Sequence, residues 1–215
     1  MEIKYFGHAS FFIKGKTATV LTDPFNPQYV GIKLPKNIES DIITVSHEHE
    51  DHNNISVVAG APFIVRGAGE YEIKNISIIG ISVFHDAQAG AQRGINTIYK
   101  IEMDGLSLVH LGDLGHILPD NVIDALGNVD VLFIPVGGVF TINPDSAVKV
   151  IADIEPSLVI PMHYRSADQA TGPFAQLATL ADFLRVCGID NIQKVSKATI
   201  SKDKLPDETQ IITFE

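Results

Sequence analysis

Residues 46–52 read Ser-His-Glu-His-Glu-Asp-His, which places three imidazoles and three carboxylates in one short segment. Each of these groups prefers water or a strong partner, so packing into a core does not explain their density. Residues two apart in an extended chain point to the same side, so His47 and His49 could offer nitrogens to one ion. Asp51 and His52 follow at once, where a turn would bring them toward a second position. This mixture of groups favours a site for zinc, iron or manganese over a solvated, charge-rich loop.

Strands must deliver these side chains to a fixed place. The apolar run Asp41–Val45 predicts a buried strand that ends at this segment. Three further candidate ligands, His85, Asp113 and His163, each follow an apolar run in the same way. Taken alone, each is more often a structural residue. Because α/β proteins gather functional side chains at such strand ends, their recurrence there predicts that they meet around the 46–52 segment.

Composition and charge exclude several classes of protein. The chain has 215 residues, of which 45% are hydrophobic and 20% charged, so one globular domain over residues 1–215 is expected. The formal net charge of −10 argues against nucleic acid as the main partner. Cys187 is the only cysteine, which excludes an internal disulfide and a cysteine-based zinc finger. No signal-peptide segment and no run of ~18 apolar residues is present, so a cytoplasmic protein without a membrane partner is predicted.

Turn residues divide the chain into short elements that predict a layered α/β domain. The predicted strands of the first half are 2–6, 10–14, 18–22, 41–45, 63–65, 71–74, 76–84, 97–102 and 106–110. In the second half, strands at 131–135 and 158–161 alternate with helices at 120–126, 146–154 and 175–186. A short helix is also expected over 53–59, and short strands are expected in the tail.

The segment 46–52 resembles the His-x-His-x-Asp-His signature of the metallo-β-lactamase superfamily. His85, Asp113 in Gly-Asp-Leu-Gly-His, and His163 in Pro-Met-His-Tyr follow in the order of that superfamily. The opening Phe-Gly-His-Ala-Ser-Phe-Phe-Ile, with Thr-Asp-Pro-Phe soon after, is similar to a subgroup of predicted zinc-dependent hydrolases that includes the ascorbate-6-phosphate lactonases. The similarity runs over nearly the whole chain. Its motifs are specific for the superfamily and much less so for a substrate.

This resemblance implies an α/β fold: a four-layer αβ/βα sandwich of two mixed sheets flanked by helices, with metals in a cleft at one edge. It implies two divalent metal ions, Zn²⁺ in the first place, with Mn²⁺ or Fe as alternatives. The implied ligands are His47, His49 and His85 for the first ion, Asp51, His52 and His163 for the second, and Asp113 as a bridge. Metallo-β-lactamases proper use a cysteine at the second metal, where this chain has Asp113, so antibiotic hydrolysis is not expected.

The charges of this ligand set favour two ions over one. Five neutral histidines and two carboxylates carry −2, two divalent ions +4 and a bridging hydroxide −1, which leaves +1. That surplus would hold an anionic substrate group and stabilise negative charge in the transition state. Two ions can also lower the pKa of bridging water from about 15.7 toward 7. The expected reaction is therefore hydrolysis of an ester, lactone, amide or phosphoester of a small anionic metabolite by a metal-bridging hydroxide, which Asp51 would orient.

Three further residues could support the site, and a fourth histidine is assigned to the core. His8 lies in a Gly-His-Ala turn that the resemblance places near the cleft, and it could be a general acid, a hydrogen-bond donor to substrate or a surface histidine. His116, three residues after Asp113, could line the same cleft as a catalytic residue. Asp23 could fix the tautomer of a ligating imidazole, or could belong to a plain Asp-Pro turn. His110 lies inside an apolar strand and is interpreted as a core histidine.

Two other functions stay open. A phosphodiesterase or nuclease of the same superfamily usually carries a clamp domain or basic exosite, for which 215 residues leave no room. A non-enzymatic metal-binding or redox module would carry a diiron site and normally recruit a flavin domain, which is not expected within these residues. The expected partner is a small-molecule substrate, and homo-oligomer formation is left open. Arg93 and Arg165, in loops that would set specificity, could each hold a carboxylate or phosphate or could be solvated.

Overall fold

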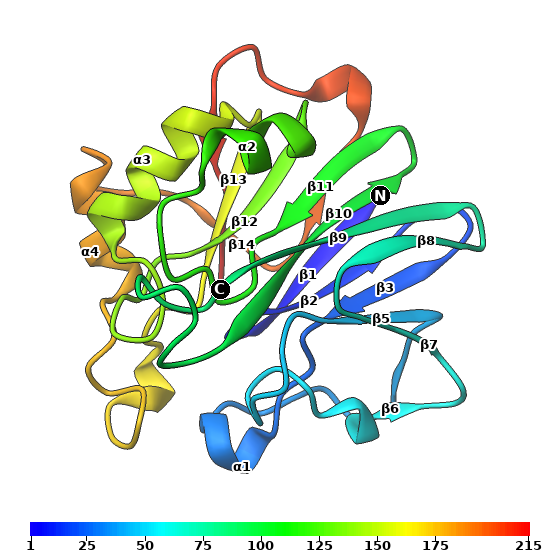
Figure 1. The fold of residues 1–215 in the computed structure, drawn as a ribbon, viewed down its shortest axis with the longest axis horizontal. Coiled ribbons are helices and arrows are strands. Elements are labelled where there is room, and N and C mark those ends of the chain that lie inside the picture. Colours follow the sequence, from blue (N-terminus) through cyan, green and yellow to red (C-terminus); the bar gives the residue numbers. More distant parts are fainter.

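The computed structural model describes all residues 1–215 and contains two mixed β-sheets that pack against each other, with helices outside them (Figure 1). The N-terminal sheet has the strand order β15-β1-β2-β3-β5-β7. Its strands are β1 (Glu2–Gly7), β2 (Ser10–Lys14), β3 (Thr19–Thr22), β5 (Ile42–Val45), β7 (Phe63–Arg66) and β15 (Ala198–Thr199).

The C-terminal sheet has the order β16-β13-β12-β11-β10-β9-β8. Its strands are β8 (Gly69–Ile73), β9 (Ile76–Phe84), β10 (Ile95–Met103), β11 (Leu106–His110), β12 (Val131–Pro135), β13 (Leu158–Met162) and β16 (Gln210–Ile211). Two further pairs join β4 (Ile38–Glu39) to β6 (Val58–Ala59) and β14 (Lys194–Val195) to β17 (Thr213–Phe214). The runs predicted at 76–84, 106–110 and 131–135 are strands with those same bounds.

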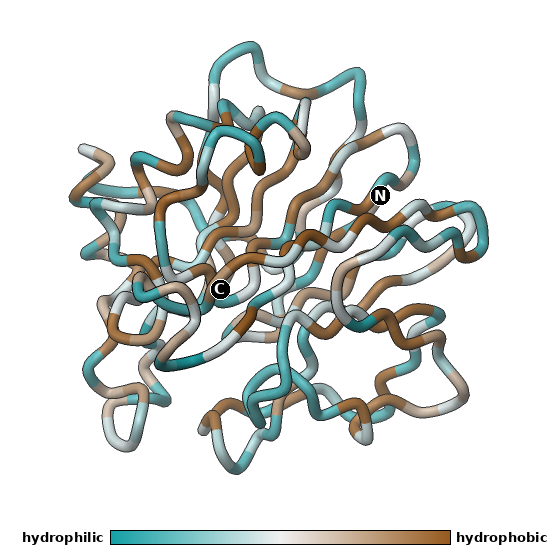
Figure 2. Tube along the Cα trace, in the orientation of Figure 1, coloured by the Kyte–Doolittle hydropathy of each residue, from teal (hydrophilic) through white to brown (hydrophobic).

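The main core fills the space between the two sheets, and Figure 2 shows apolar stretches along the central strands of both. Phe11 of β2 and Phe133 of β12 approach to 4.4 Å between ring centroids. Burial of each such side chain contributes about 1.5–3 kcal/mol. Tyr99 of β10 is also fully buried, and its hydroxyl donates to the carbonyl oxygen of Val45 at 2.8 Å. This bond ties the C-terminal sheet to the end of β5, directly before the 46–52 segment.

Three helices, α2 (Asp120–Leu126), α3 (Pro144–Ile154) and α4 (Leu180–Val186), lie outside the C-terminal sheet (Figure 1). Helix α3 buries Ala147, Val150 and Ile154, which share one face at helical spacing. Asn143 caps its N-terminus, because the side chain of Asn143 accepts the N–H of Ser146 at 2.9 Å. No helix in the structure has the length and apolarity needed to cross a membrane.

Two expected helices differ from the structure. The helix expected over 175–186 begins only at Leu180, because Thr179 and Asp182 form a capping box that satisfies the first backbone N–H groups there. The helix expected over 53–59 is one 3-10 turn at Ile55–Val57, because the next two residues form β6 and pair with β4. That turn, the pair β4–β6 and the short helix α1 (Pro27–Val30) accompany the N-terminal sheet, so no long helix covers its outer face.

Several strands end at one edge of the sandwich. Strands β3 and β5 are parallel, and so are β11, β12 and β13. Strand β9 runs in the same direction as β11, because each is antiparallel to β10. Asp23 follows β3, segment 46–52 follows β5, and His85 and His163 follow β9 and β13. The fold therefore carries residues from distant parts of the sequence to a common place.

Candidate metal centre

The seven candidate ligands come together at this edge, in three overlapping groups that could each hold a metal ion. Within each group the donor atoms lie within 4.8 Å of one another. The groups are His47, His49 and His85; His8, Asp51, His52 and His163; and His47, His52 and Asp113. The structure thus adds His8 to the residues that the sequence singled out as ligands.

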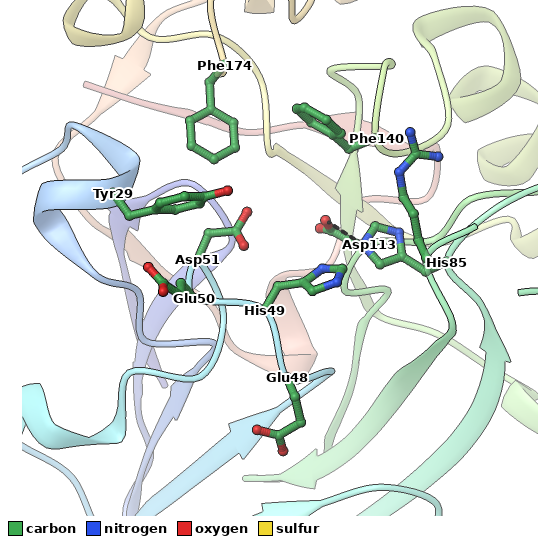
Figure 3. Close-up of a pocket in the computed structure, with 10 residues that line it drawn as sticks. Tyr29, Glu48, His49, Glu50, Asp51, His85, Asp113, Phe140 and Phe174 are labelled. Carbon is green, nitrogen blue, oxygen red and sulfur yellow. Dashed lines mark ion pairs between the residues drawn. The ribbon is translucent and has the colours of Figure 1, made fainter. Parts of the chain in front are cut away.

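Asp113 lies between the histidines of this cluster. Its Oδ1 is 3.2 Å from Nε2 of His52. Its Oδ2 is 3.4 Å from Nε2 of His85 and 3.3 Å from Nε2 of His163, and Figure 3 shows His85 turned toward it. Burial would raise the pKa of Asp113, but the facing imidazoles of His163 and His52 outweigh burial and hold this pKa well below its usual range. Asp113 is therefore an ionised carboxylate shared by several imidazoles.

Several buried ligand atoms in the cluster have no hydrogen-bond partner. They include Nε2 of His47, His52 and His163 and Oδ1 of Asp113. A buried polar atom without a partner costs about 1–3 kcal/mol, and native proteins keep few of them. Bound cations would satisfy these lone pairs, and imidazole with carboxylate is a donor set that zinc, iron and manganese accept. The residues present therefore fit a metal centre.

Asp23 fixes the orientation of two of the histidines. Its Oδ2 accepts hydrogen bonds from Nδ1 of His52 at 2.8 Å and from Oγ of Ser46 at 2.6 Å. Because the Ser46 hydroxyl donates to Asp23, it accepts from Nδ1–H of His47 at 2.9 Å. Both tautomers, assigned from this network, leave Nε2 free to bind a cation. The geometry agrees with the supporting role expected for Asp23.

Burial favours the neutral form of His47 and His85, which is the form that binds metal. Burial lowers the pKa of His47 well below 6.5 and also lowers the pKa of His85. His52 differs: burial would lower its pKa, but Asp113 and Asp51 outweigh burial and raise it well above 6.5. The carboxylates of Asp113 and Asp51 thus favour positive charge at this place.

His8 is buried against Asp51 and is not a surface histidine. Its Nε2 lies 3.0 Å from Oδ2 of Asp51, and only 1% of the residue is exposed. Its ring centroid is 4.0 Å from that of His163 and 5.0 Å from that of Phe174. Burial lowers the pKa of His8 to about 4. A side chain so enclosed does not reach the cleft, so the geometry favours orientation of Asp51 over a role as general acid or as hydrogen-bond donor to substrate.

The turns that carry these residues have unusual backbone conformations. His8, Asp23 and His163 have φ values of 56°, 37° and 53°, in the left-handed region. Such a conformation costs about 1–3 kcal/mol for a residue other than glycine and persists where surrounding structure imposes it. Two turns hold each other here, because the N–H of His163 donates to the carbonyl oxygen of His8 at 2.7 Å. The backbone conformation of these turns, as well as the side-chain contacts, therefore holds the site together.

Asn96 supports Asp113, and sequence reasoning missed it. Its Oδ1 accepts the N–H of Asp113 at 2.9 Å, and its Nδ2 donates to the carbonyl oxygen of Leu111 at 2.8 Å. Gly112, between Leu111 and Asp113 in the sequence, has φ +54°. A Cβ at this position would lie 2.3 Å from Oδ1 of Asn96 and 2.7 Å from Cβ of Ser46. The turn therefore requires glycine. A buried amide inside the apolar strand β10 was the only sign of this role in the sequence.

Two other histidines stay outside the cleft. Nε2 of His116 accepts the N–H of Phe84 at 3.2 Å, and its Nδ1 donates to the carbonyl oxygen of Ile117 at 2.7 Å. Because both nitrogens have backbone partners and the ring does not line the cleft, the geometry gives no support to the expected catalytic role of His116. His110 is fully buried and donates from Nε2 to the carbonyl oxygen of Ala9 at 2.8 Å, which agrees with its interpretation as a core histidine.

A cleft of about 440 Å³ opens over the cluster, a size that suits a small molecule. Figure 3 shows Tyr29, Phe140 and Phe174 along one side of it and the candidate ligands His49, Asp51 and His85 below them. Its lining residues are Tyr29, Glu48, His49, Glu50, Asp51, His85, Arg93, Asp113, Phe140 and Phe174. The three aromatic residues come from separate segments and carry no motif, so the sequence did not reveal them.

Comparison with known proteins gives the family. The model of the beta-lactamase superfamily domain matches residues 2–163. A UPF0173 metal-dependent hydrolase of Thermococcus kodakarensis is 30% identical over 195 residues, which span 77% of this chain and 85% of the relative. A crystal structure from Thermotoga maritima, of a protein assigned to the Zn-dependent hydrolases of the metallo-β-lactamase superfamily, has a TM-score of 0.80. It is 31% identical, and the match covers 99% of this chain and 97% of that chain.

A structure from Veillonella parvula, with a TM-score of 0.72 at 15% identity over 93% of this chain and 99% of that chain, shows likeness of the fold alone. These matches confirm the α/β sandwich that the motifs predicted. The chain belongs to the metallo-β-lactamase superfamily and, within it, to the UPF0173 metal-dependent hydrolases.

Proposed function

We propose that the protein is a binuclear zinc hydrolase that cleaves an ester, lactone or phosphoester of a small anionic metabolite. The observation that carries this proposal is the set of buried, unpaired ligand atoms beside a cleft of about 440 Å³. Unpaired nitrogens and carboxylate oxygens are satisfied by cations, and the cleft has the dimensions of a small-molecule site. The lactone is favoured among the esters by the resemblance of the opening motif to the ascorbate-6-phosphate lactonases.

The ligand groups support two positions for metal. His47, His49 and His85 would hold the first ion, Asp51, His52 and His163 would hold the second, and Asp113 would lie between them. When bound, the ions supply Lewis acidity and make water at the site acidic enough to ionise near neutral pH. Asp23 and Ser46 keep Nε2 of His47 available, and Asp23 does the same for His52.

Asp51 is the residue of this set that would orient the attacking water. It lines the cleft, and its Oδ2 contacts Nε2 of His8 at 3.0 Å. This contact fixes the carboxylate that would ligate the second ion and accept a hydrogen bond from water. His8 would therefore hold the carboxylate plane, and Asp51 would align the water with the scissile bond.

The lining of the cleft weighs against a nuclease. Strands of nucleic acid are bound by several basic side chains that follow the phosphates. Arg93 is the only cationic side chain that lines this cleft, and Glu48 and Glu50 stand at the same surface. A single small anion is a better match to one arginine.

Metal analysis and a substrate panel test the proposal. Purified protein should contain close to two zinc ions per chain and hydrolyse at least one member of a panel of lactones, thioesters and phosphodiesters. His49→Ala and Asp113→Ala should lose both metal and hydrolysis, whereas Arg185→Ala, on the exposed face of α4, should keep both.

Full activity with intact metal in either ligand variant would refute the ligand assignment. Iron in place of zinc, with the visible absorbance of a diiron centre and no hydrolysis, would instead identify a redox module.

A further inference from the structure

Arg93 is a half-buried cation in the cleft that has no anionic partner. None of the ion pairs in the structure includes it, and its only side-chain hydrogen bond runs from Nη2 to the carbonyl oxygen of Val139 at 3.2 Å. A guanidinium has several N–H donors in a fixed fork, so most of them are left for another ligand. Arg66, at the adjoining pocket, differs because Glu48 already neutralises it. Arg93 is therefore the one uncompensated positive side chain that faces the cleft.

The backbone of Arg93 is held in place by Asp86. The Asp86 carboxylate accepts the backbone N–H groups of Gln88, Gly90, Gln92 and Arg93 at 2.8–3.0 Å. Asp86 directly follows His85, whose own N–H donates to the carbonyl oxygen of Gly94 at 3.0 Å. The loop 86–94 thus fixes Arg93 relative to a candidate metal ligand.

The side chain of Arg93 is also held at one place. Its guanidinium carbon lies 5.6 Å from the ring centroid of Phe140, a cation–π contact. A freely solvated arginine has no such contact, samples many rotamers and loses this side-chain entropy when it binds an anion. Here the contacts with Phe140 and Val139 have already restricted it, so an incoming oxyanion meets an ordered fork.

Aromatic side chains form the wall beside this cation. The ring centroids of Phe140 and Phe174 are 6.0 Å apart, and those of Tyr29 and Phe174 are 5.8 Å apart, both pairs edge to face. Figure 3 shows the three rings along one side of the cleft. An apolar group on a ligand would bury its surface there. The rings run from Phe140, beside Arg93, through Phe174 to Tyr29, and Asp51 lines the same cleft.

We infer that Arg93 binds a carboxylate or phosphate of the substrate at a distance from the scissile bond, while Tyr29, Phe140 and Phe174 contact an apolar portion between the two. The substrate class is then a short acyl or aryl compound that carries a terminal oxyanion. This inference rests on the proposed function, because it names what the hydrolytic site accepts.

Calorimetric titration of the zinc-loaded protein with a pair of non-hydrolysable ligands tests it. Benzylsuccinate has one carboxylate more than 3-phenylpropionate. The ratio of their affinities therefore measures how much the second carboxylate adds to binding, whichever group the first carboxylate contacts. The wild type should bind benzylsuccinate about 10–100-fold more tightly, as expected for a charged hydrogen bond. Arg93→Met, which keeps an unbranched side chain but removes the charge, should bring the ratio close to one, and Arg93→Lys should retain part of it.

Arg185→Ala removes an exposed arginine on α4 and should leave the ratio unchanged. The inference is overturned if the wild type shows no preference for benzylsuccinate, if Arg93→Met weakens both ligands equally, or if Arg185→Ala lowers the ratio as much. Metal content and thermal unfolding of each variant identify any that fails to fold. Because the readout is binding, absence of hydrolysis would refute the proposed function and leave this measurement valid.

Discussion

Oδ2 of Asp23 lies 2.8 Å from Nδ1 of His52, and this contact determines which nitrogen of His52 faces the candidate metal centre. The same carboxylate oxygen accepts the hydroxyl of Ser46, which in turn accepts from His47. One buried aspartate therefore determines the tautomer and orientation of two imidazoles. Burial would raise the pKa of Asp23, but His52 outweighs burial and lowers it, so Asp23 is an ionised acceptor.

Asp23→Asn should weaken metal binding while the fold is kept. The carboxylate of Asp23 has two acceptor oxygens, whereas the amide of asparagine has one oxygen and an NH₂ group that only donates. An NH₂ group facing His52 or Ser46 cannot accept their hydrogen bonds, so the tautomers of His52 and His47 are no longer enforced. We expect the affinity for zinc to fall about 10–100-fold in competition with a chromophoric chelator. Asp41→Asn is the control, because Asp41 also accepts a backbone N–H in the N-terminal sheet but lies outside the cluster. Equal zinc affinity of the two variants would contradict the role of Asp23.

His8→Ala should reduce metal at the second position, because Asp51 loses the partner that holds its carboxylate. We expect the zinc content to fall from about two toward one per chain and kcat to fall about 10–100-fold. His116→Ala is a matched control: its nitrogens contact only backbone, and it should keep metal and nearly all activity. Elemental analysis and steady-state kinetics on both variants measure this. A greater loss in His116→Ala than in His8→Ala would reverse the assignment.

Gly112→Ala should destabilise the protein more than an ordinary glycine substitution does. The new Cβ would collide with Asn96 and Ser46, in addition to the strain of a positive φ. Gly60→Ala provides the comparison, because Gly60 has φ +85° but nothing within 4 Å of the added carbon. We expect Gly60→Ala to lower the free energy of unfolding by about 1–2 kcal/mol. Gly112→Ala should lower it by about 1–3 kcal/mol more in urea titrations, and equal losses would show that the turn can relax.

Asp86→Asn should lower stability in a way that depends on pH. Burial would raise the pKa of Asp86, but four backbone N–H groups outweigh burial and lower it from 3.8 to about 2. A carboxyl whose pKa is lower in the folded state stabilises the fold fully at pH values above its pKa in the unfolded state. This contribution is lost as the pH falls through its pKa in the folded state. The difference in unfolding free energy between wild type and variant should therefore be constant above pH ~5 and shrink between about 4 and 2. A difference that stays constant over this range would mean that the charge of Asp86 does not matter.

The residue types at 46–52, and their counterparts after three apolar runs, were sufficient to identify the family and the candidate ligands. Coordination depends on which donors the chain carries, and the period of a strand decides which of them share a side. His47 and His49 could therefore be paired from their spacing alone. Strand bounds such as 106–110 could also be predicted locally, because turn residues mark where a strand ends.

Other features were decided by contacts between segments far apart in the sequence. The segment 53–59 has the composition of a short helix, but pairing of Val58 with Ile38 makes its last part a strand. His8 became a partner of Asp51 only because the N-terminal turn packs on His163. Asn96 and the aromatic wall of the cleft belong to no motif.

The reason is physical. A metal ligand is recognised by its own chemistry, which the sequence states directly. A wall residue such as Phe140 or a support such as Asn96 acquires its role from what the folded chain places beside it. The sequence therefore identified the candidate metal ligands, and tertiary structure decided the shape of the cleft and the position of Arg93 within it.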